Sequence, residues 1–372
     1  MEKAYKFRIY PNIEQIEQIK KTFDGCRFVY NFFLNKRIEA YKTNGDSLNY
    51  NACSAMLTSL KNDSDRSWLK EPDSTALQSS VKDLDFAYQN FLRNVKKGDK
   101  PGFPKWKLRK TLHRSYKTKL VGKNIEVFES HIKLPKLGLV NAAVSKRIEG
   151  RIINATVSKA SSGKYFVSVC CTDVDIPQYK STGKQIGVDM GIKCLVTTSD
   201  GILHSKHDFI KRSEKKLANL QRQLSRKSKG SNNRNKARIK VARLQENIAN
   251  QRSDSIHKLT TMLVKEYDVI CVEDLAIKNM VKNRRLAKSI FDASWGELIR
   301  QLQYKCEWQH KLLVKVGRTF ASSQNCNKCG YKNADVKNLK VRSWDCPCCG
   351  VLLDRDVNAA INILHEGLRL IA

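Results

Sequence analysis

Two short cysteine motifs near the C-terminus restrict the fold of this chain more than any other feature. Each motif reads Cys-x-x-Cys-Gly, and the four cysteines are Cys326, Cys329, Cys346 and Cys349. Two such knuckles can bring four thiolates to tetrahedral distance from one Zn²⁺ ion. Cys348 is a further thiol, but the repeated register excludes it from the ligand set. We therefore predict a zinc ribbon over residues 321–350, whose metal is structural because four sulfur ligands leave no open position for water.

Three carboxylates lie within or beside apolar segments. Asp189 interrupts the run QIGVDMGI, Glu273 follows the run DVICV, and Asp356 lies in DRDVNAAINIL, where it opens a predicted helix. Burying a lone carboxylate is costly unless a cation or hydrogen-bond donors compensate. Gly187 and Gly191 would let another group approach Asp189 closely, and Ala359 and Ala360 would allow the helix at Asp356 to pack closely on a sheet. Three carboxylates on separate elements are what two Mg²⁺ ions, or Mn²⁺ in their place, need to act on a phosphodiester, so the sequence predicts a catalytic magnesium site here.

Each acid also has a structural interpretation. Asp189 could accept hydrogen bonds from strand-end amides, Glu273 could pair with a nearby lysine, and Asp356 could cap a helix. Two further acids compete for the same role, since Asp274 adjoins Glu273 and Asp354 lies two residues before Asp356. Residues one or two apart on a regular element point to different faces, so one member of each pair should be excluded.

The balance of charges predicts a polyanionic partner. The chain has 69 Lys and Arg against 36 Asp and Glu, a formal net charge of +33. Such a surface repels itself, whereas binding to nucleic acid releases condensed counterions. A basic surface that confers only solubility is the weaker alternative. No apolar run approaches about 18 residues and the N-terminus lacks the apolar core of a secretory signal, so we expect a cytoplasmic protein without a membrane partner.

Periodicity along the chain predicts four parts. Apolar and polar residues alternate within residues 1–10 and again within 110–180, a pattern typical of short strands. Helical spacing of the apolar residues between these two stretches predicts helices over 27–43 and 74–95. Later apolar runs suit a central sheet covered by helices. The predicted parts are a small β-barrel or sandwich (1–10 and 110–180), a helical insertion with a basic connector (11–109), an α/β domain (181–320 and 351–372) and the zinc ribbon (321–350).

Two basic segments are candidate nucleic-acid contacts. The connector KKGDKPGFPKWKLRK, over 96–110, contains seven basic residues and two aromatics that could stack on bases or, equally, pin the loop to the core. A long helical stretch over 211–266 is broken near SKGSNN, and its first thirty residues hold twelve Lys or Arg and one Glu. Charge of this density fits phosphates better than a solvated face. The candidate contacts are Phe103, Lys105, Trp106, Lys107, Arg109, Arg222, Arg226, Lys227, Arg234, Lys236 and Arg238.

The order of these motifs resembles that of one family. The segments YKFRIYPN, GCRFVYN, GFPKWK, IGVDMGI, VEDL, FDASWG, SSQNCNKCG and CPCCGVLLDRDVNAAINIL are together similar to TnpB, the OrfB-type protein of insertion sequences, which is related to compact type V CRISPR effectors. The resemblance covers nearly the whole chain, and the cysteine knuckles just before the last acid are its most specific part. Two departures are small: Met190 follows the first acid where Leu is more usual, and Cys348 is unusual within its knuckle.

This resemblance implies a multidomain α/β fold with a RuvC-like, RNase H-type nuclease domain, an inserted zinc ribbon and a wedge-like β-barrel that carries the helical insertion. It implies acids in the order Asp, Glu, Asp, which matches Asp189, Glu273 and Asp356 and favours Asp356 over Asp354. It further implies an RNA-guided DNA endonuclease that binds a guide RNA and double-stranded and single-stranded DNA, works as a monomer, and cuts beside a short motif read in the duplex. Base pairing would then supply the sequence specificity.

Three alternatives fit the sequence less well. A nuclease-inactive, RNA-guided repressor should have lost one of the acids, and all three are present. A cut-and-paste DNA transposase generally orders its acids Asp, Asp, Glu. A zinc-ribbon transcription factor would leave the embedded acids of residues 186–320 unexplained.

Overall fold

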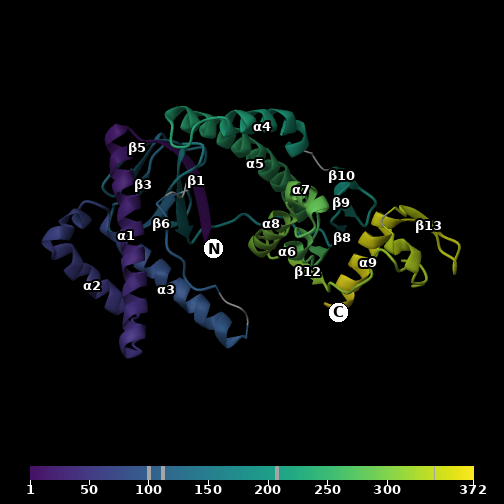
Figure 1. Ribbon diagram of the computed structural model, residues 1–372. Coiled ribbons are helices and arrows are strands. Elements are labelled where there is room, and N and C mark those ends of the chain that lie inside the picture. Colours follow the sequence, from purple (N-terminus) through teal and green to yellow (C-terminus); the bar gives the residue numbers. More distant parts are fainter. Residues whose placement is uncertain (99–101, 110–113, 206–208, 339) are drawn as a thin grey trace. The chain divides into compact units, whose positions relative to one another are not determined.

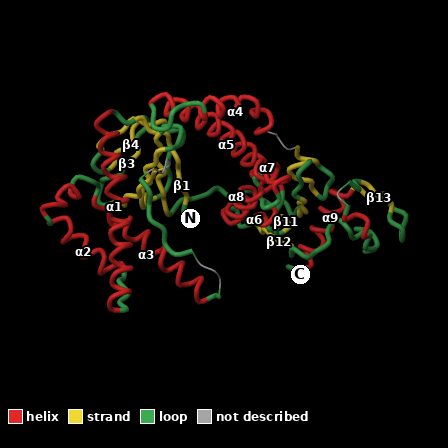
Figure 2. Tube along the Cα trace, viewed as in Figure 1, coloured by secondary structure: helices red, strands yellow, loops and turns green. Residues whose placement is uncertain are grey.

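The computed structural model divides into two compact units, Met1–Asp175 and Ile176–Ala372 (Figure 1). Both units combine helices with a β-sheet, which confirms the mixed α/β class (Figure 2). The predicted barrel boundary at residue 110 lies outside the described residues. The residues that the structure describes are 1–98, 102–109, 114–205, 209–338 and 340–372.

The first unit is built on a seven-stranded antiparallel sheet of order β2-β6-β7-β1-β5-β4-β3. In β1 the alternate side chains of Tyr5, Phe7 and Ile9 are buried, as expected for a strand with one face on the core. Strand β1 pairs with both β5 and β7, so the N-terminal strand joins the later strands as predicted. The strands are β1 (Lys3–Tyr10), β2 (Arg114–Lys119), β3 (Glu126–Val127), β4 (His131–Leu134), β5 (Gly138–Ala143), β6 (Arg151–Lys159) and β7 (Tyr165–Thr172).

The described strands form an open sheet rather than the predicted closed β-barrel. Strands β2 and β3 are its two edges, and no pairing joins them within the described residues. Helix α3 (Ser74–Lys96) lies beside β2, where the hydroxyl oxygens of Thr75 and Thr118 are 2.7 Å apart and the backbone amide of Lys119 donates to the Thr75 hydroxyl at 3.3 Å. Helix α3 therefore occupies the position beside β2 that a strand closing the barrel would need.

The helical insertion begins with one long helix, α1 (Ile13–Asn44), where the sequence predicted a separate helix over 27–43. The helix starts at a capping box formed by Asn12. Gly25 does not interrupt it. A Cβ at Gly25 would lie 2.9 Å from the ring of Pro72, so glycine allows the helix to pass this segment closely. The other helical elements are α2 (Tyr50–Asn62), a 3₁₀ helix (Ser64–Lys70) and α3, which matches the predicted helix over 74–95.

The second unit is built on a five-stranded mixed sheet of order β10-β9-β8-β11-β12. Strand β8 pairs antiparallel with β9 and parallel with β11, and β11 pairs parallel with β12. The strands coincide with the apolar runs from which the sequence predicted a central sheet. They are β8 (Gln185–Asp189), β9 (Cys194–Thr198), β10 (Leu203–Ser205), β11 (Val269–Glu273) and β12 (Leu312–Val316).

Helices cover both faces of this sheet. Helix α9 (Arg355–Arg369) packs on one face so closely that a Cβ at Gly187 would lie 2.0 Å from the carbonyl oxygen of Ala360, which confirms the predicted close approach. On the other face, Ile186 and Val188 of β8 form a core with α5 and α8. None of the helices within the described residues is long and apolar enough to span a bilayer. The remaining helices are α4 (Phe209–Ser225), α5 (Asn232–Glu266), α6 (Ile277–Met280), α7 (Arg284–Ala293) and α8 (Trp295–Trp308).

Candidate functional site

Two of the predicted acids end neighbouring parallel strands. Asp189 is the last residue of β8 and Glu273 the last residue of β11, and the register between the strands pairs Val188 with Val272. Both valines face the core formed with α5 and α8. Because side chains alternate along a strand, Asp189 and Glu273 lie on the opposite face, the face on which α9 packs against Gly187.

Helix α9 brings the third acid to this face. Asp356 lies in its first turn, but the helix cap is Asp354, whose Oδ1 accepts hydrogen bonds from the backbone amides of Asp356 at 3.0 Å and Val357 at 2.9 Å. The capping role that was an alternative for Asp356 is therefore filled by Asp354. The Asp356 carboxylate instead contacts Arg342, with Oδ1 3.5 Å from Nη1. This arrangement supports Asp356 over Asp354 as the third acid.

The three carboxylates interact electrostatically. Burial, followed by the negative charges of Glu273 and Asp356, raises the pKa of Asp189 from 3.8 to about 7, while Arg355 and the backbone amide of Met190 act in the opposite direction. A cation among the acids would relieve both the desolvation and the mutual repulsion. The donor set is all oxygen, which is the set that Mg²⁺ and Mn²⁺ prefer. The three acids are therefore the candidate ligands of a divalent metal.

Glu273 has a partner that the sequence analysis did not single out. The hydroxyl of Ser322 donates a hydrogen bond to Glu273 Oε1. Asp274, the competing neighbour, turns away from this contact and pairs with Arg318 at 2.7 Å. Only the position of Ser322 in SSQNC, just before the first knuckle, distinguished it in the sequence.

The four predicted cysteines form a compact cluster. Their sulfur atoms all lie within 4.8 Å of one another, with 3.7 Å between Cys326 and Cys349 and 3.5 Å between Cys329 and Cys346. Cys348 is exposed and outside this group, as predicted. Among the described residues, these cysteines alone gather one ligand atom each so tightly. Four sulfur ligands at these separations are compatible with tetrahedral Zn²⁺.

The two knuckles repeat one backbone geometry. The amide of Gly330 donates to the carbonyl of Cys326 at 2.9 Å, and the amide of Gly350 donates to the carbonyl of Cys346 at 2.8 Å. Both glycines have positive φ, 77° and 69°, which a residue with a Cβ adopts only with strain. The left-handed backbone conformation therefore explains why a glycine follows each pair of cysteines. The supporting elements are a 3₁₀ helix (Ala334–Lys337) and strands β13 (Ser343–Asp345) and β14 (Leu352–Asp354).

The connector supports both interpretations of its aromatic residues. Phe103 packs edge-on against Tyr88 with ring centroids 5.5 Å apart, so it fastens the loop to α3 while remaining 45% exposed. The Lys107 ammonium lies 4.0 Å from the centre of the Tyr30 ring, while the residue as a whole is exposed. All five candidate contacts of the connector are exposed: Phe103, Lys105, Trp106, Lys107 and Arg109.

The basic helical stretch forms two helices, α4 and α5, separated at SKGSNN as predicted. Arg234 has a structural role in this hairpin, because its Nη1 donates to the carbonyls of Leu224 at 3.0 Å and Lys227 at 2.9 Å and so closes the end of α4. Arg238 is half-buried. The exposed candidates of the hairpin are Arg222, Arg226, Lys227 and Lys236.

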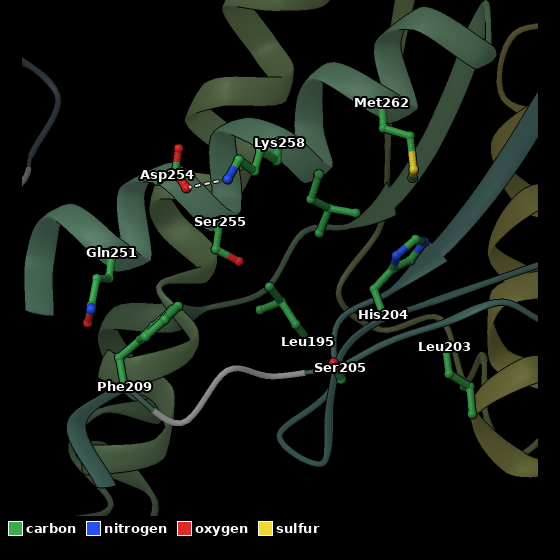
Figure 3. Close-up of a pocket in the computed structure, with 11 residues that line it drawn as sticks. Leu195, Leu203, His204, Ser205, Phe209, Gln251, Asp254, Ser255, Lys258 and Met262 are labelled. Carbon is green, nitrogen blue, oxygen red and sulfur yellow. Dashed lines mark ion pairs between the residues drawn. The ribbon is translucent and has the colours of Figure 1, made fainter. Parts of the chain in front are cut away.

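A cavity of about 670 Å³ lies between β9, β10 and α5 (Figure 3). Leu195 and Met262 contribute apolar side chains, and Asp254 and Lys258, one helical turn apart on α5, form an ion pair of 2.7 Å at its border. None of the three acids lines it. The cavity is therefore separate from the candidate metal site.

The fold and the sequence both have known relatives. A solved structure, "Cryo-EM structure of the Cas12f1-sgRNA-target DNA complex", matches with a TM-score of 0.60 at 15% identity and covers 98% of each chain, so the two chains share a fold. A "Putative RNA-guided DNA endonuclease" of Streptomyces pristinaespiralis is 38% identical over 99% of this chain and 90% of its own length. "Putative RNA-guided DNA endonuclease InsQ" of Escherichia coli (strain K12) is 35% identical over 99% and 93%.

Family profiles match three stretches of the chain. They are described as "Probable transposase", of the OrfB type (residues 168–284), "Cas12f1-like, TNB domain" (295–363) and "Helix-turn-helix domain" (1–46). In the structure, the last of these stretches is β1 followed by the single helix α1. With relatives of this identity along nearly its full length, the chain belongs to the TnpB family, the OrfB-type proteins of insertion sequences.

Proposed function

We propose that this protein is an RNA-guided DNA endonuclease that cuts DNA by metal-dependent phosphodiester hydrolysis at a RuvC-like, RNase H-type site. The observation that carries the proposal is the convergence of Asp189, Glu273 and Asp356 on one face of the sheet, where the pKa of Asp189 rises to about 7. The names of the relatives and the fold shared with Cas12f1 support the same activity.

Each acid has a defined part in this site. Bound Mg²⁺ or Mn²⁺ would supply the positive charge that activates water and stabilises the leaving oxygen. Asp189 and Glu273 present their carboxylates from rigid strand ends, and Asp356 presents its carboxylate from the first turn of α9. Arg342 contacts Asp356 and Ser322 contacts Glu273, so both side chains are oriented before a metal binds.

The partners are a guide RNA and its DNA target. The net charge of +33 requires a polyanion, and the exposed basic residues of the α4–α5 hairpin and the connector can contact phosphates. In this proposal RNA pairing with the target strand provides the sequence specificity, while the protein contacts the backbone and reads a short adjacent motif. In this proposal the protein acts as a monomer.

The four-cysteine cluster holds a structural Zn²⁺ ion in this proposal. All four ligands come from the protein, so no position is left for a reacting water. The cluster lies in the segment between β12 and α9, the helix that carries Asp356, and the metal would fix how this segment enters the helix.

The decisive experiment separates binding from cutting. Asp189→Ala removes one metal ligand but leaves the basic residues that contact phosphate, so the RNA-bound protein should bind matching DNA with near-normal affinity while cleavage falls by orders of magnitude. Gel shift and cleavage are measured on the same substrate, with Mg²⁺ and with chelator. Efficient cutting by the variant would refute the assignment of the acids, and absence of co-purifying RNA would refute the guide.

A further inference from the structure

The segment that enters the cysteine cluster is fastened to helix α9 by two asparagines. Asn358 and Asn362 lie one helical turn apart, and both side chains are buried. Their Nδ2 atoms donate to the same carbonyl, that of Asn325, at 2.8 Å and 2.6 Å. Asn358 Oδ1 also accepts from the backbone amide of Asn327 at 3.0 Å. These contacts grip the chain on either side of Cys326, the first cysteine of the cluster.

Asn362 also holds the backbone of Ser322. Asn362 Nδ2 donates to the carbonyl of Ser322 at 2.8 Å, and Ser322 is itself only 6% exposed. Because the backbone of Ser322 is held from α9, its hydroxyl has a fixed place from which it donates to Glu273 Oε1. Hydrogen bonds to a carboxylate that binds metal orient the ligand and its free oxygen.

We propose that Ser322 is a positioning residue for Glu273, and that the zinc ribbon and α9 hold it through Asn362. The proposal deepens the proposed function and rests on it. One donor would fix Oε1 and leave Oε2 of the same carboxylate available to bind a metal that Asp189 also holds. The ribbon thereby acts on catalysis through a hydrogen-bonded path that starts at its first knuckle and ends at the second acid.

A matched pair of variants isolates the hydroxyl. Ser322→Thr keeps it and Ser322→Val removes it, while the two side chains have nearly the same shape, so any common cost of the added methyl cancels. The full chain is purified with the RNA that it carries, and Mn²⁺ is titrated with detection by electron paramagnetic resonance. The RNA-bound complex of Asp189→Ala serves as the blank for ions held elsewhere. Ser322→Val should bind Mn²⁺ roughly 10–100-fold more weakly than Ser322→Thr.

Three further readouts separate positioning from general damage. Zinc content and DNA affinity should be equal in the two variants, and cleavage by Ser322→Val should recover as Mn²⁺ is raised, because the missing contact affects the metal site alone. Ser323→Ala is the control in the same segment, since within the described residues the hydrogen bond to Glu273 comes from Ser322. This control should leave the Mn²⁺ titration unchanged.

The possible outcomes distinguish a failure of the Ser322 proposal from a failure of the proposed nuclease function. If Glu273→Gln abolishes cleavage but Ser322→Val and Ser322→Thr bind Mn²⁺ equally, Ser322 does not position Glu273 and the nuclease proposal stands. If Glu273→Gln itself binds Mn²⁺ and cuts like the wild type, the nuclease site is wrongly assigned and both proposals fail. If Asn362→Ala keeps its zinc and its Mn²⁺ affinity, the path through α9 is refuted.

Discussion

Replacing Asp189 with asparagine should make the metal-free protein more stable at neutral and alkaline pH. Burial and the charges of Glu273 and Asp356 raise the pKa of Asp189 from 3.8 to about 7, so the folded chain disfavours the charged carboxylate. Each pH unit of difference between the folded and unfolded pKa is worth about 1.4 kcal/mol, which sets an upper limit of about 4 kcal/mol for the cost of ionising this group in the folded state. The asparagine side chain would have a similar shape and no charge, and its carbonyl could still accept from the Met190 amide.

The sign of the stability difference follows from the linkage between protonation of Asp189 and folding. A carboxyl group whose folded pKa is raised contributes its stability below the unfolded pKa and loses it as pH rises through the folded pKa. Wild type and Asp189→Asn should therefore be equally stable near pH 3.5. Their difference should grow between about pH 4 and pH 7 and then stay constant, with a melting temperature up to about 10 °C higher for the variant.

The assay is thermal unfolding in chelator over a series of pH values, followed by titration of Mg²⁺ at pH 8. Mg²⁺ should stabilise the wild type by mass action and the variant far less, so the order of stability should reverse at high metal. Asp200→Asn is the control with the opposite sign. Burial raises the pKa of Asp200, but hydrogen bonds from Thr198 and Tyr267 outweigh burial and hold this pKa below 3.8. Replacing Asp200 with asparagine should therefore destabilise the folded protein at neutral pH. A pH-independent difference for Asp189→Asn would refute the electrostatic argument.

Three other perturbations test the remaining parts of the site. Cys326→Ser should release zinc and destabilise the C-terminal part of the chain, and a well-folded, active protein with less than about half an equivalent of zinc would contradict a structural site. Gly187→Ala should prevent α9 from packing on β8 and lower the melting temperature strongly, whereas Gly317→Ala, which meets open space, should be mild. Asp354→Ala removes a helix cap and should cost about 1 kcal/mol, with far less loss of cleavage than Asp356→Ala. Equal cleavage losses at these two positions would count against Asp356 as the third acid.

The sequence determined the features that depend on residue type at short range. Two Cys-x-x-Cys-Gly motifs bring their ligands together through local backbone geometry, because each glycine takes a left-handed φ that completes its knuckle. The apolar runs that became β8 and β11 were visible for the same reason: burial on both faces requires apolar residues whatever the neighbours are. The acids at the ends of these runs, Asp189 and Glu273, were recognisable as exceptions to that rule.

Only the tertiary structure decided which groups meet. The parallel register of β8 and β11 and the packing of α9 bring Asp356 toward the other two acids. Apart from its place just before the first knuckle, Ser322 had no sequence signal, since a serine becomes a positioning group only through the side chain that its hydroxyl reaches. The open first sheet has a similar cause. Alternation predicts strands but not closure, and the packing of α3 beside β2 depends on contacts between residues far apart in the chain.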